Sequence, residues 1–103
     1  MGSAKRATSE NLLAVLTLHE RGSYGAAAQA LERDSATVKY HLMATRQAYD
    51  DDVLTYTEGS WQPTAMGVQI LELAHKARLL KDALTGLDLT EPAGQEPASE
   101  DAA

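Results

Sequence analysis

The sequence contains no cysteine, which excludes disulfide bonds and thiolate chemistry and is compatible with a cytoplasmic protein. It has no apolar run near the roughly 20 residues that a membrane-spanning helix requires. The first residues are polar, so a secretory signal peptide is not expected. These absences predict a cytoplasmic location and no association with a membrane.

Phenylalanine is absent too, and the chain of 103 residues holds a single tryptophan. With 44% hydrophobic residues, this length is enough for one small core built mainly of leucine, alanine, valine and isoleucine. The residue pattern predicts a flexible start at 1–8, a compact body at 9–64, a long helix at 65–90 and a disordered acidic tail at 91–103.

Positive charge is scarce, since nine Lys and Arg residues stand against fifteen Asp and Glu residues, for a net charge of −6. Residues 1–82 hold all nine bases and ten of the acids, whereas residues 83–103 hold the other five acids and no base. The body is therefore close to neutral. Because phosphate neutralisation supplies most non-specific affinity for DNA, we expect any DNA binding to be weak or dependent on a dimer.

Three helices are predicted in the first fifty residues. The first begins at Thr8 or Ser9 and ends near Gly22, a residue that favours helix termination. A short alanine-rich helix follows at 24–32, and its small side chains allow close packing. The third helix covers 35–49 after a cap at Asp34 or Ser35, and its spacing turns four residues inward: Val38, Leu42, Thr45 and Tyr49.

A β-hairpin is predicted next, from strands near 53–57 and 61–62 joined by a three-residue turn at 58–60. Tyr56 and Trp61 are expected to pack this hairpin against the body. Pro63 ends the second strand, and Thr64 caps a final helix at about 65–87. Helices, a hairpin and a long last helix, in this order, predict a mainly α winged helix-turn-helix.

The final helix carries an apolar repeat with spacings of 3, 4, 3, 4 and 3 residues, in Ile70, Leu73, Ala77, Leu80, Leu84 and Leu87. One interpretation is the core-facing side of a single helix. The other, which we favour, is the a/d seam of a homodimer over roughly two and a half heptads. A small winged domain has little core left to cover so long a stripe.

Nothing in the sequence indicates catalysis, a cofactor or a metal. His19, His41 and His75 lie on three separate predicted helices without metal-ligand spacing, and they are interpreted as surface or interface residues. The acidic triplet 50–52 lacks the spacing of a calcium loop and is interpreted as a solvated turn. No nucleophile elbow or glycine-rich phosphate loop is present, so the protein is not expected to be an enzyme.

If the helix at 35–49 reads DNA, the residues of its outward face reach base edges and phosphates. Lys39 can bind a guanine edge or a phosphate, and Tyr40 can stack or form a hydrogen bond. Backbone and hydroxyl groups at the start of the helix can donate to phosphate. The candidate DNA-contacting residues are Arg33, Ser35, Ala36, Thr37, Lys39, Tyr40, Met43 and Arg46.

Residues 11–80 resemble the N-terminal DNA-binding domain of LysR-type transcriptional regulators, and the N-terminal domain of molybdate regulators is similar. The stretch 13–28 (LAVLTLHERGSYGAAA) resembles that family's first helix, its Gly-Ser-aromatic turn and its paired alanines. The stretch 31–42 lies at the position of its recognition helix. Val53-Leu54 and Thr64-Ala65-Met66-Gly67 resemble the motifs on either side of its wing.

The resemblance implies a winged helix-turn-helix that forms dimers through its last helix. It places the family's DNA-facing Ser-Gln-Pro-Ala segment on residues 34–37 and its Ser-Arg pair on Lys39 and Tyr40. This chain departs from that pattern, because Asp34 brings an acid to the helix start, Tyr40 replaces an arginine and Thr57 replaces the wing arginine. No effector-binding domain of the family's kind is expected in 103 residues.

The sequence therefore predicts a homodimeric DNA-binding transcription regulator of bacterial or phage type. The alternative is a winged-helix module that binds another protein, such as a second regulator, and does not bind DNA strongly. The surface of the helix at 35–49 distinguishes the two. A positive patch joined to Arg33 and Arg46 favours DNA, whereas a neutral patch around Tyr40 and Met43 favours a protein.

Overall fold

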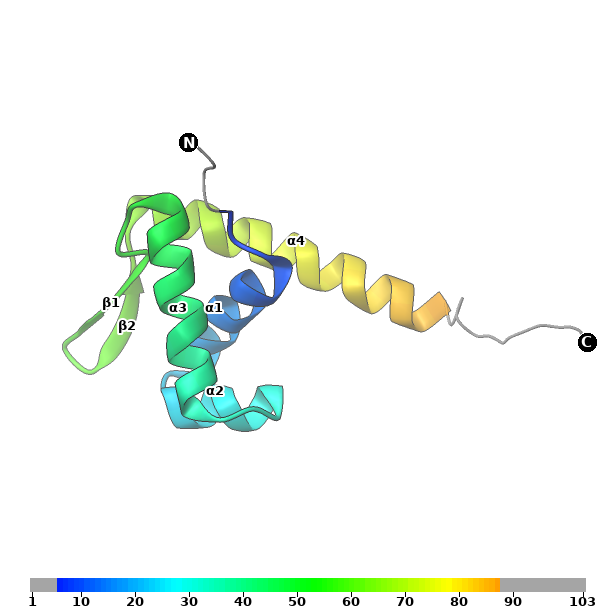
Figure 1. Cartoon of the computed structure of the whole chain (residues 1–103), viewed down its shortest axis with the longest axis horizontal. Coiled ribbons are helices and arrows are strands. Elements are labelled where there is room, and N and C mark those ends of the chain that lie inside the picture. The colour runs from blue at the N-terminus through cyan, green and yellow to red at the C-terminus, as the bar shows by residue number, and fades with distance from the viewer. Residues whose placement is uncertain (1–5, 88–103) are drawn as a thin grey trace, which may run out of the picture.

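In the computed structural model, residues 6–87 are described, without the side chain of Leu87, and they form four helices and one β-hairpin (Figure 1). The elements follow the order α1 (Ser9–Arg21), α2 (Tyr24–Leu31), α3 (Ser35–Tyr49), β1 (Leu54–Thr57), β2 (Ser60–Pro63) and α4 (Ala65–Leu87). This is the predicted winged helix-turn-helix. The expected tail at 91–103 and the first five residues of the expected flexible start lie outside the described residues.

Local caps begin the first three helices. The Thr8 hydroxyl accepts a hydrogen bond from the Asn11 backbone N–H, and the Asn11 side chain accepts one from the Thr8 N–H, which forms a capping box at α1. The Ser23 hydroxyl accepts a bond from the Ala26 N–H at α2. Asp34 rather than Ser35 caps α3, and its carboxylate accepts bonds from both the N–H and the hydroxyl of Thr37.

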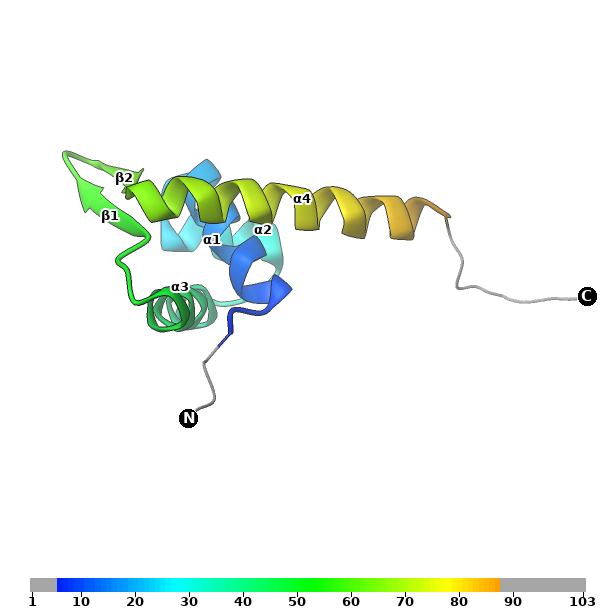
Figure 2. The same cartoon turned by 90° about the horizontal axis from the view of Figure 1, so that it is seen from above.

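Helix α1 lies at the centre of the fold and packs against α2, α3 and α4. Seen from above, α3 lies on one side of α1 and α4 on the other (Figure 2). The core between these elements consists of Val15, Leu18, Ala27, Ala28, Val38, Leu42, Val53, Leu54 and Ile70. The predicted inward positions of α3 are confirmed, since Val38, Leu42 and Thr45 are buried and Tyr49 is half-buried against the core.

The hairpin turn is shorter than predicted. Thr57 pairs with Ser60, so only Glu58 and Gly59 form the loop. Both have positive φ angles, 53° and 82°, as the primed two-residue turn of a twisted hairpin requires. Ser60 therefore belongs to β2 rather than to the turn.

The base of the hairpin is fixed by four residues that we call the Asp51 junction: Asp51, Val53, Thr64 and Gly67. Asp51 Oδ2 accepts a bond of 2.7 Å from the Val53 N–H and one of 2.6 Å from the Thr64 hydroxyl. These bonds lower the pKa of Asp51, the Thr64 hydroxyl being the larger cause. The Thr64 hydroxyl also accepts a bond from the Gly67 N–H and so caps α4. The predicted solvated turn thus contains a structural carboxylate.

Gly67 is the residue of the Asp51 junction that tolerates no side chain. A Cβ atom there would collide with the Val53 carbonyl, which accepts a bond of 3.0 Å from the Thr64 N–H. Val53 itself is fully buried with a φ of 66°, a strained conformation for a β-branched residue. For this reason β1 begins at Leu54 rather than at the predicted residue 53.

Helix α4 is held to α1 by a bidentate ion pair on the outside of the fold. Arg78 Nη1 and Nη2 lie 2.9 and 2.8 Å from the two carboxylate oxygens of Glu20. This pairing lowers the pKa of Glu20 and raises that of Arg78. Beyond it, α4 continues away from the body (Figure 1). In the part of the chain that the structure describes, no helix is long and apolar enough to cross a membrane.

Gly67→Ala is predicted to destabilise the protein by about 1–3 kcal/mol or more, because the added methyl displaces α4 from the Val53 carbonyl. Gly86→Ala is the matched control, since Gly86 lies in the same helix with open space around its Cα. That change should stabilise α4 by roughly 0.5–1 kcal/mol. Urea unfolding followed by circular dichroism measures both, and equal stability of Gly67→Ala and the wild type would contradict the close approach.

Candidate nucleic-acid interface

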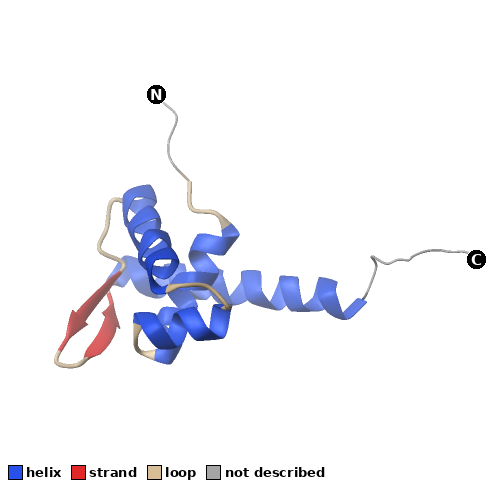
Figure 3. Cartoon of the chain, turned by 60° about the horizontal axis from the view of Figure 1, so that its bottom comes forward, coloured by secondary structure: helices blue, strands red, loops and turns tan. Residues whose placement is uncertain are grey.

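Helix α3 has one buried side and one open side. Tyr40 and Met43 are 64% and 56% exposed, and Ala36 is exposed beside them. We call these three residues the outer stripe, since spacings of four and three residues place them on one face of a helix. Figure 3 shows α3 beside the hairpin, with no other element of the described chain in front of it. The outer stripe is therefore accessible to a large ligand such as a DNA duplex.

The N-terminus of α3 is already occupied by a carboxylate of the chain itself, that of Asp34. Asp34 Oδ1 lies 2.8 Å from the Thr37 nitrogen and 2.7 Å from its hydroxyl oxygen, so Thr37 donates to Asp34 rather than outward. Both bonds lower the pKa of Asp34, the hydroxyl being the larger cause, and keep it ionised. Ser35 is half-buried in the same turn. A DNA phosphate approaching this helix end meets a carboxylate there.

The predicted cations of α3 lie at the side that faces the hairpin. Lys39 Nζ lies 5.3 Å from the centre of the Tyr24 ring, within the range of a cation–π contact. Arg46 was expected to contact the DNA backbone, but its guanidinium is used within the chain. Its Nε and Nη2 donate to the carbonyl oxygens of Asp52 and Leu54, at 2.8 and 2.7 Å, and so bind the loop before β1.

Aromatic rings connect α2 to the hairpin. The ring centres of Tyr24 and Trp61 lie 5.4 Å apart and those of Tyr56 and Trp61 5.2 Å apart, both edge to face. Trp61 is half-buried against the core, as predicted. Tyr56 was expected to pack inward as well, but it is exposed, although it pairs with Trp61 across the hairpin and its ring contacts the Trp61 ring. The rings hold the wing close to Lys39.

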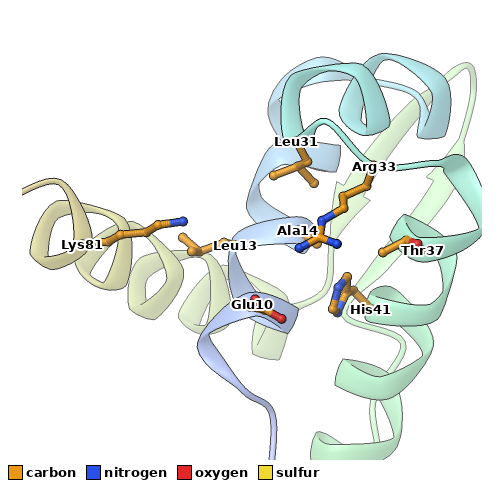
Figure 4. Close-up of a pocket in the computed structure, with 8 residues that line it drawn as sticks. All are labelled: Glu10, Leu13, Ala14, Leu31, Arg33, Thr37, His41 and Lys81. Carbon is orange, nitrogen blue, oxygen red and sulfur yellow. The ribbon is translucent and has the colours of Figure 1, made fainter. Parts of the chain in front are cut away.

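Arg33 lies beside a small cavity rather than on the outer stripe. The cavity has a volume of about 170 Å³ and lies between α1, the end of α2, α3 and α4. Figure 4 shows Arg33 extending from the turn before α3 toward Ala14 on α1, with Glu10 and His41 below it in this view. Lys81 of α4 also lines this cavity.

Sequence reasoning missed the connection between α3 and α1. The Asn11 side-chain nitrogen lies 2.7 Å from His41 Nδ1, and Asn11 is buried. Because the Asn11 oxygen is used in the capping box, its NH₂ group faces His41, whose Nδ1 must therefore accept the bond as a neutral ring. Burial lowers the pKa of His41; Glu10 opposes the shift and Arg33 adds to it. His19 and His75 are exposed.

The predicted dimer residues separate into two groups. Ile70 is only 1% exposed and belongs to the core, so its inclusion in the interface was wrong: α1 covers this part of α4. Leu73, Leu80 and Leu84 are exposed and Ala77 is half-buried. These four residues, spaced by 4, 3 and 4, form a leucine stripe on α4. The side chain of Leu87 lies outside the described residues.

No metal centre is visible in the described chain. Among residues 6–87, no three His, Cys, Asp or Glu side chains are placed to share a metal ion. The features that the structure does present are the open face of α3, the hairpin beside it and the exposed leucine stripe of α4.

No family model and no curated protein matches this sequence. Solved structures do match. OxyR from Corynebacterium glutamicum, in its oxidized form, superposes with a TM-score of 0.71 at 18% identity, over 85% of this chain and 27% of that one. ArgP from Mycobacterium tuberculosis gives 0.68 at 24% identity, over 81% and 32%.

CbnR, a LysR family transcriptional regulator, gives a TM-score of 0.64 at 23% identity, over 79% of this chain and 27% of that one. The chain thus spans about a third or less of the length of the structures it matches. At these identities the likeness establishes the architecture and leaves activity open.

His41→Asn is predicted to flatten the pH dependence of stability near neutrality. Because the pKa of His41 is lowered from its unfolded value of about 6.5, the unfolded state binds more protons. The contribution of neutral His41 to the free energy of unfolding is complete above the unfolded pKa. It is lost as the pH falls through the pKa of the folded state. An asparagine oxygen at this position can still accept the Asn11 bond. Urea midpoints between pH 8 and 5 measure the slope.

His75→Asn, at an exposed site on α4, is the control and should retain the wild-type slope. The lowered pKa values of Glu20, Asp34 and Asp51 change the stability of the protein only at more acidic pH. A wild-type slope in His41→Asn would contradict the assigned neutral ring.

The described chain shares the winged helix-turn-helix fold of the LysR-type regulators whose structures it matches.

Proposed function

We propose that this protein is a DNA-binding transcription regulator that acts as a homodimer and inserts α3 into the major groove. The observation that carries the proposal is the open outer face of α3 beside the wing, with Lys39 on the wing side and Arg33 in the turn before it. A helix of this diameter fits the major groove of B-DNA, and wing and turn then lie near the phosphates. The regulators that share the fold support the same use.

Base and phosphate contacts are divided among the predicted residues. Ala36, Tyr40 and Met43 would face base edges, and Lys39 would reach the backbone, where long cationic side chains can bind phosphates. Arg33 lines the cavity beside α1 and would have to turn outward to reach a phosphate. Ser35 and Thr37 contribute less than the sequence implied, because both are half-buried and Thr37 is bound to Asp34. Arg46 supports the wing rather than the DNA.

The leucine stripe supports the homodimer. Leu80 and Leu84 are 62% and 51% exposed where α4 has left the body. Next to them, a hollow of about 310 Å³ between α4 and the start of α1 is lined by Ala77, Leu80, Leu84 and Leu13. Packing two copies along this stripe would bury these side chains and place two copies of α3 on one duplex. A dimer raises affinity where each body alone is close to neutral.

A protein partner is the second candidate, and one observation favours it. The outer stripe carries no charge, and the turn before α3 holds two acids, Glu32 and Asp34. Exposed Tyr and Met side chains are typical of protein interfaces. In that case, α3 would bind another regulatory protein and DNA affinity would be negligible.

Selection of random-sequence duplexes by the purified protein, repeated over a series of salt concentrations, tests the proposed function. We expect sequence-selective binding whose affinity falls steeply with salt, because phosphate contacts release counterions. Lys39→Ala combined with Tyr40→Ala should reduce selective affinity at least about tenfold. Lys76→Ala, which removes an exposed cation from α4, is the control and should bind as the wild type does.

Unchanged selective affinity in the double variant would remove α3 as the reading helix. Absence of DNA binding at low salt, from a folded dimer, would reject the function and favour the protein-binding alternative.

Leu80→Glu combined with Leu84→Glu is predicted to produce monomers, because two charges per copy replace apolar contacts along the stripe. Leu79→Glu is the matched control. Leu79 is 56% exposed on the same helix but lies about 100° around it from Leu80. Light scattering should report a dimer for the wild type and the control. A dimer of the double variant would place the interface elsewhere.

A further inference from the structure

The outer stripe of α3 is uncharged along the part of the helix that enters a major groove first. Ala36 and Met43 present only apolar or weakly polar atoms, and Tyr40 adds a single hydroxyl. All three point away from the core, since Val38, Leu42 and Thr45 occupy the buried side. A reading helix built in this way contacts bases mainly through methyl and methylene groups.

The charged groups of α3 make contacts within the chain, although Lys39 borders the stripe, three residues after Ala36 and four before Met43. Lys39 lies over the Tyr24 ring, and Arg46 donates to the Asp52 and Leu54 carbonyls. Asp34 is bound to Thr37 at the helix start. The bidentate arginine–guanine contact, the commonest specific contact to DNA, is therefore not offered by the middle of this helix.

Only one base presents an apolar group in the major groove. Thymine carries a C5 methyl, whereas guanine presents acceptors, cytosine a donor and adenine one of each. Alanine or methionine packed on a G·C edge would cover polar atoms without replacing their hydrogen bonds to water, which is unfavourable. The same side chains packed on a thymine methyl bury apolar surface on both sides.

We propose that Ala36 and Met43 read thymine methyl groups, so that this protein selects operators with A·T pairs under α3. The inference rests on the proposed DNA-binding function and specifies its sequence preference. Seven residues separate the two side chains, a rise of about 10 Å along the helix, which corresponds to roughly three base pairs. Each half-site then contains two thymines about that far apart, on either strand.

The test uses the duplex that the protein selects from the random library. Each thymine is replaced in turn by deoxyuridine, which removes the C5 methyl and keeps the pairing edge. Loss of one buried methyl should weaken binding about fourfold at the two thymines under α3. Replacing thymines elsewhere in the duplex should leave the affinity unchanged.

Met43→Ala identifies the reading side chain. In this variant the uracil effect should disappear at one of the two thymines and persist at the other, which Ala36 contacts. Leu79→Ala is the control, because Leu79 has the same 56% exposure as Met43 but lies on α4. It should retain both uracil effects.

Selective binding that ignores every uracil replacement would overturn the inference and leave the DNA-binding function intact. A uracil effect that is identical in Met43→Ala and the wild type would also overturn it, since the methyl would then act through DNA shape. Absence of any DNA binding would reject the inference together with the function on which it rests.

Discussion

The carboxylate of Asp51 is the group on which the arrangement of the wing and the long helix depends. It binds the Val53 N–H before β1 and the Thr64 hydroxyl after β2, and so connects the two ends of the hairpin. The Thr64 hydroxyl in turn caps α4 through Gly67, and Gly67 lets α4 approach the Val53 carbonyl. The pKa of Asp51 is lowered because these bonds favour the ionised carboxylate, so they are strongest while Asp51 is charged.

This arrangement leaves one face of α3 and one face of α4 open. Helix α1 fills the space between α3 and α4, so the outer stripe and most of the leucine stripe have no cover within the described chain. Single exposed apolar side chains are normal, but Leu80 and Leu84 lie on one face of α4 with Leu73, which is typical of an interaction surface. Two open faces on different helices are what the proposed function needs, one for a nucleic acid and one for a second copy.

Sequence patterns predicted the features that depend on residues close together in the chain. They did not predict the contacts between residues far apart in the chain. The caps at Thr8, Ser23 and Asp34, the inward face of α3 and the hairpin follow from local patterns, and all are present. The Asn11–His41 and Asp51–Thr64 bonds join residues 30 and 13 positions apart, which no local pattern reveals. Ile70 fits the heptad as well as Leu80 does, and only the position of α1 shows that it is core.

Asp34 at the start of α3 is consistent with a helix that would read DNA bases rather than attract phosphates. A phosphate at a helix start is attracted by free N–H groups, but here the carboxylate occupies the Thr37 N–H and adds a negative charge. Non-specific attraction to the backbone is thereby weakened. A protein with weak backbone affinity gains selectivity only from close contact with bases, which an uncharged outer stripe permits without bringing a buried charge into the groove. If the proposed function holds, the acid at the cap and the apolar stripe act together, and base identity rather than phosphate charge would determine where the protein binds.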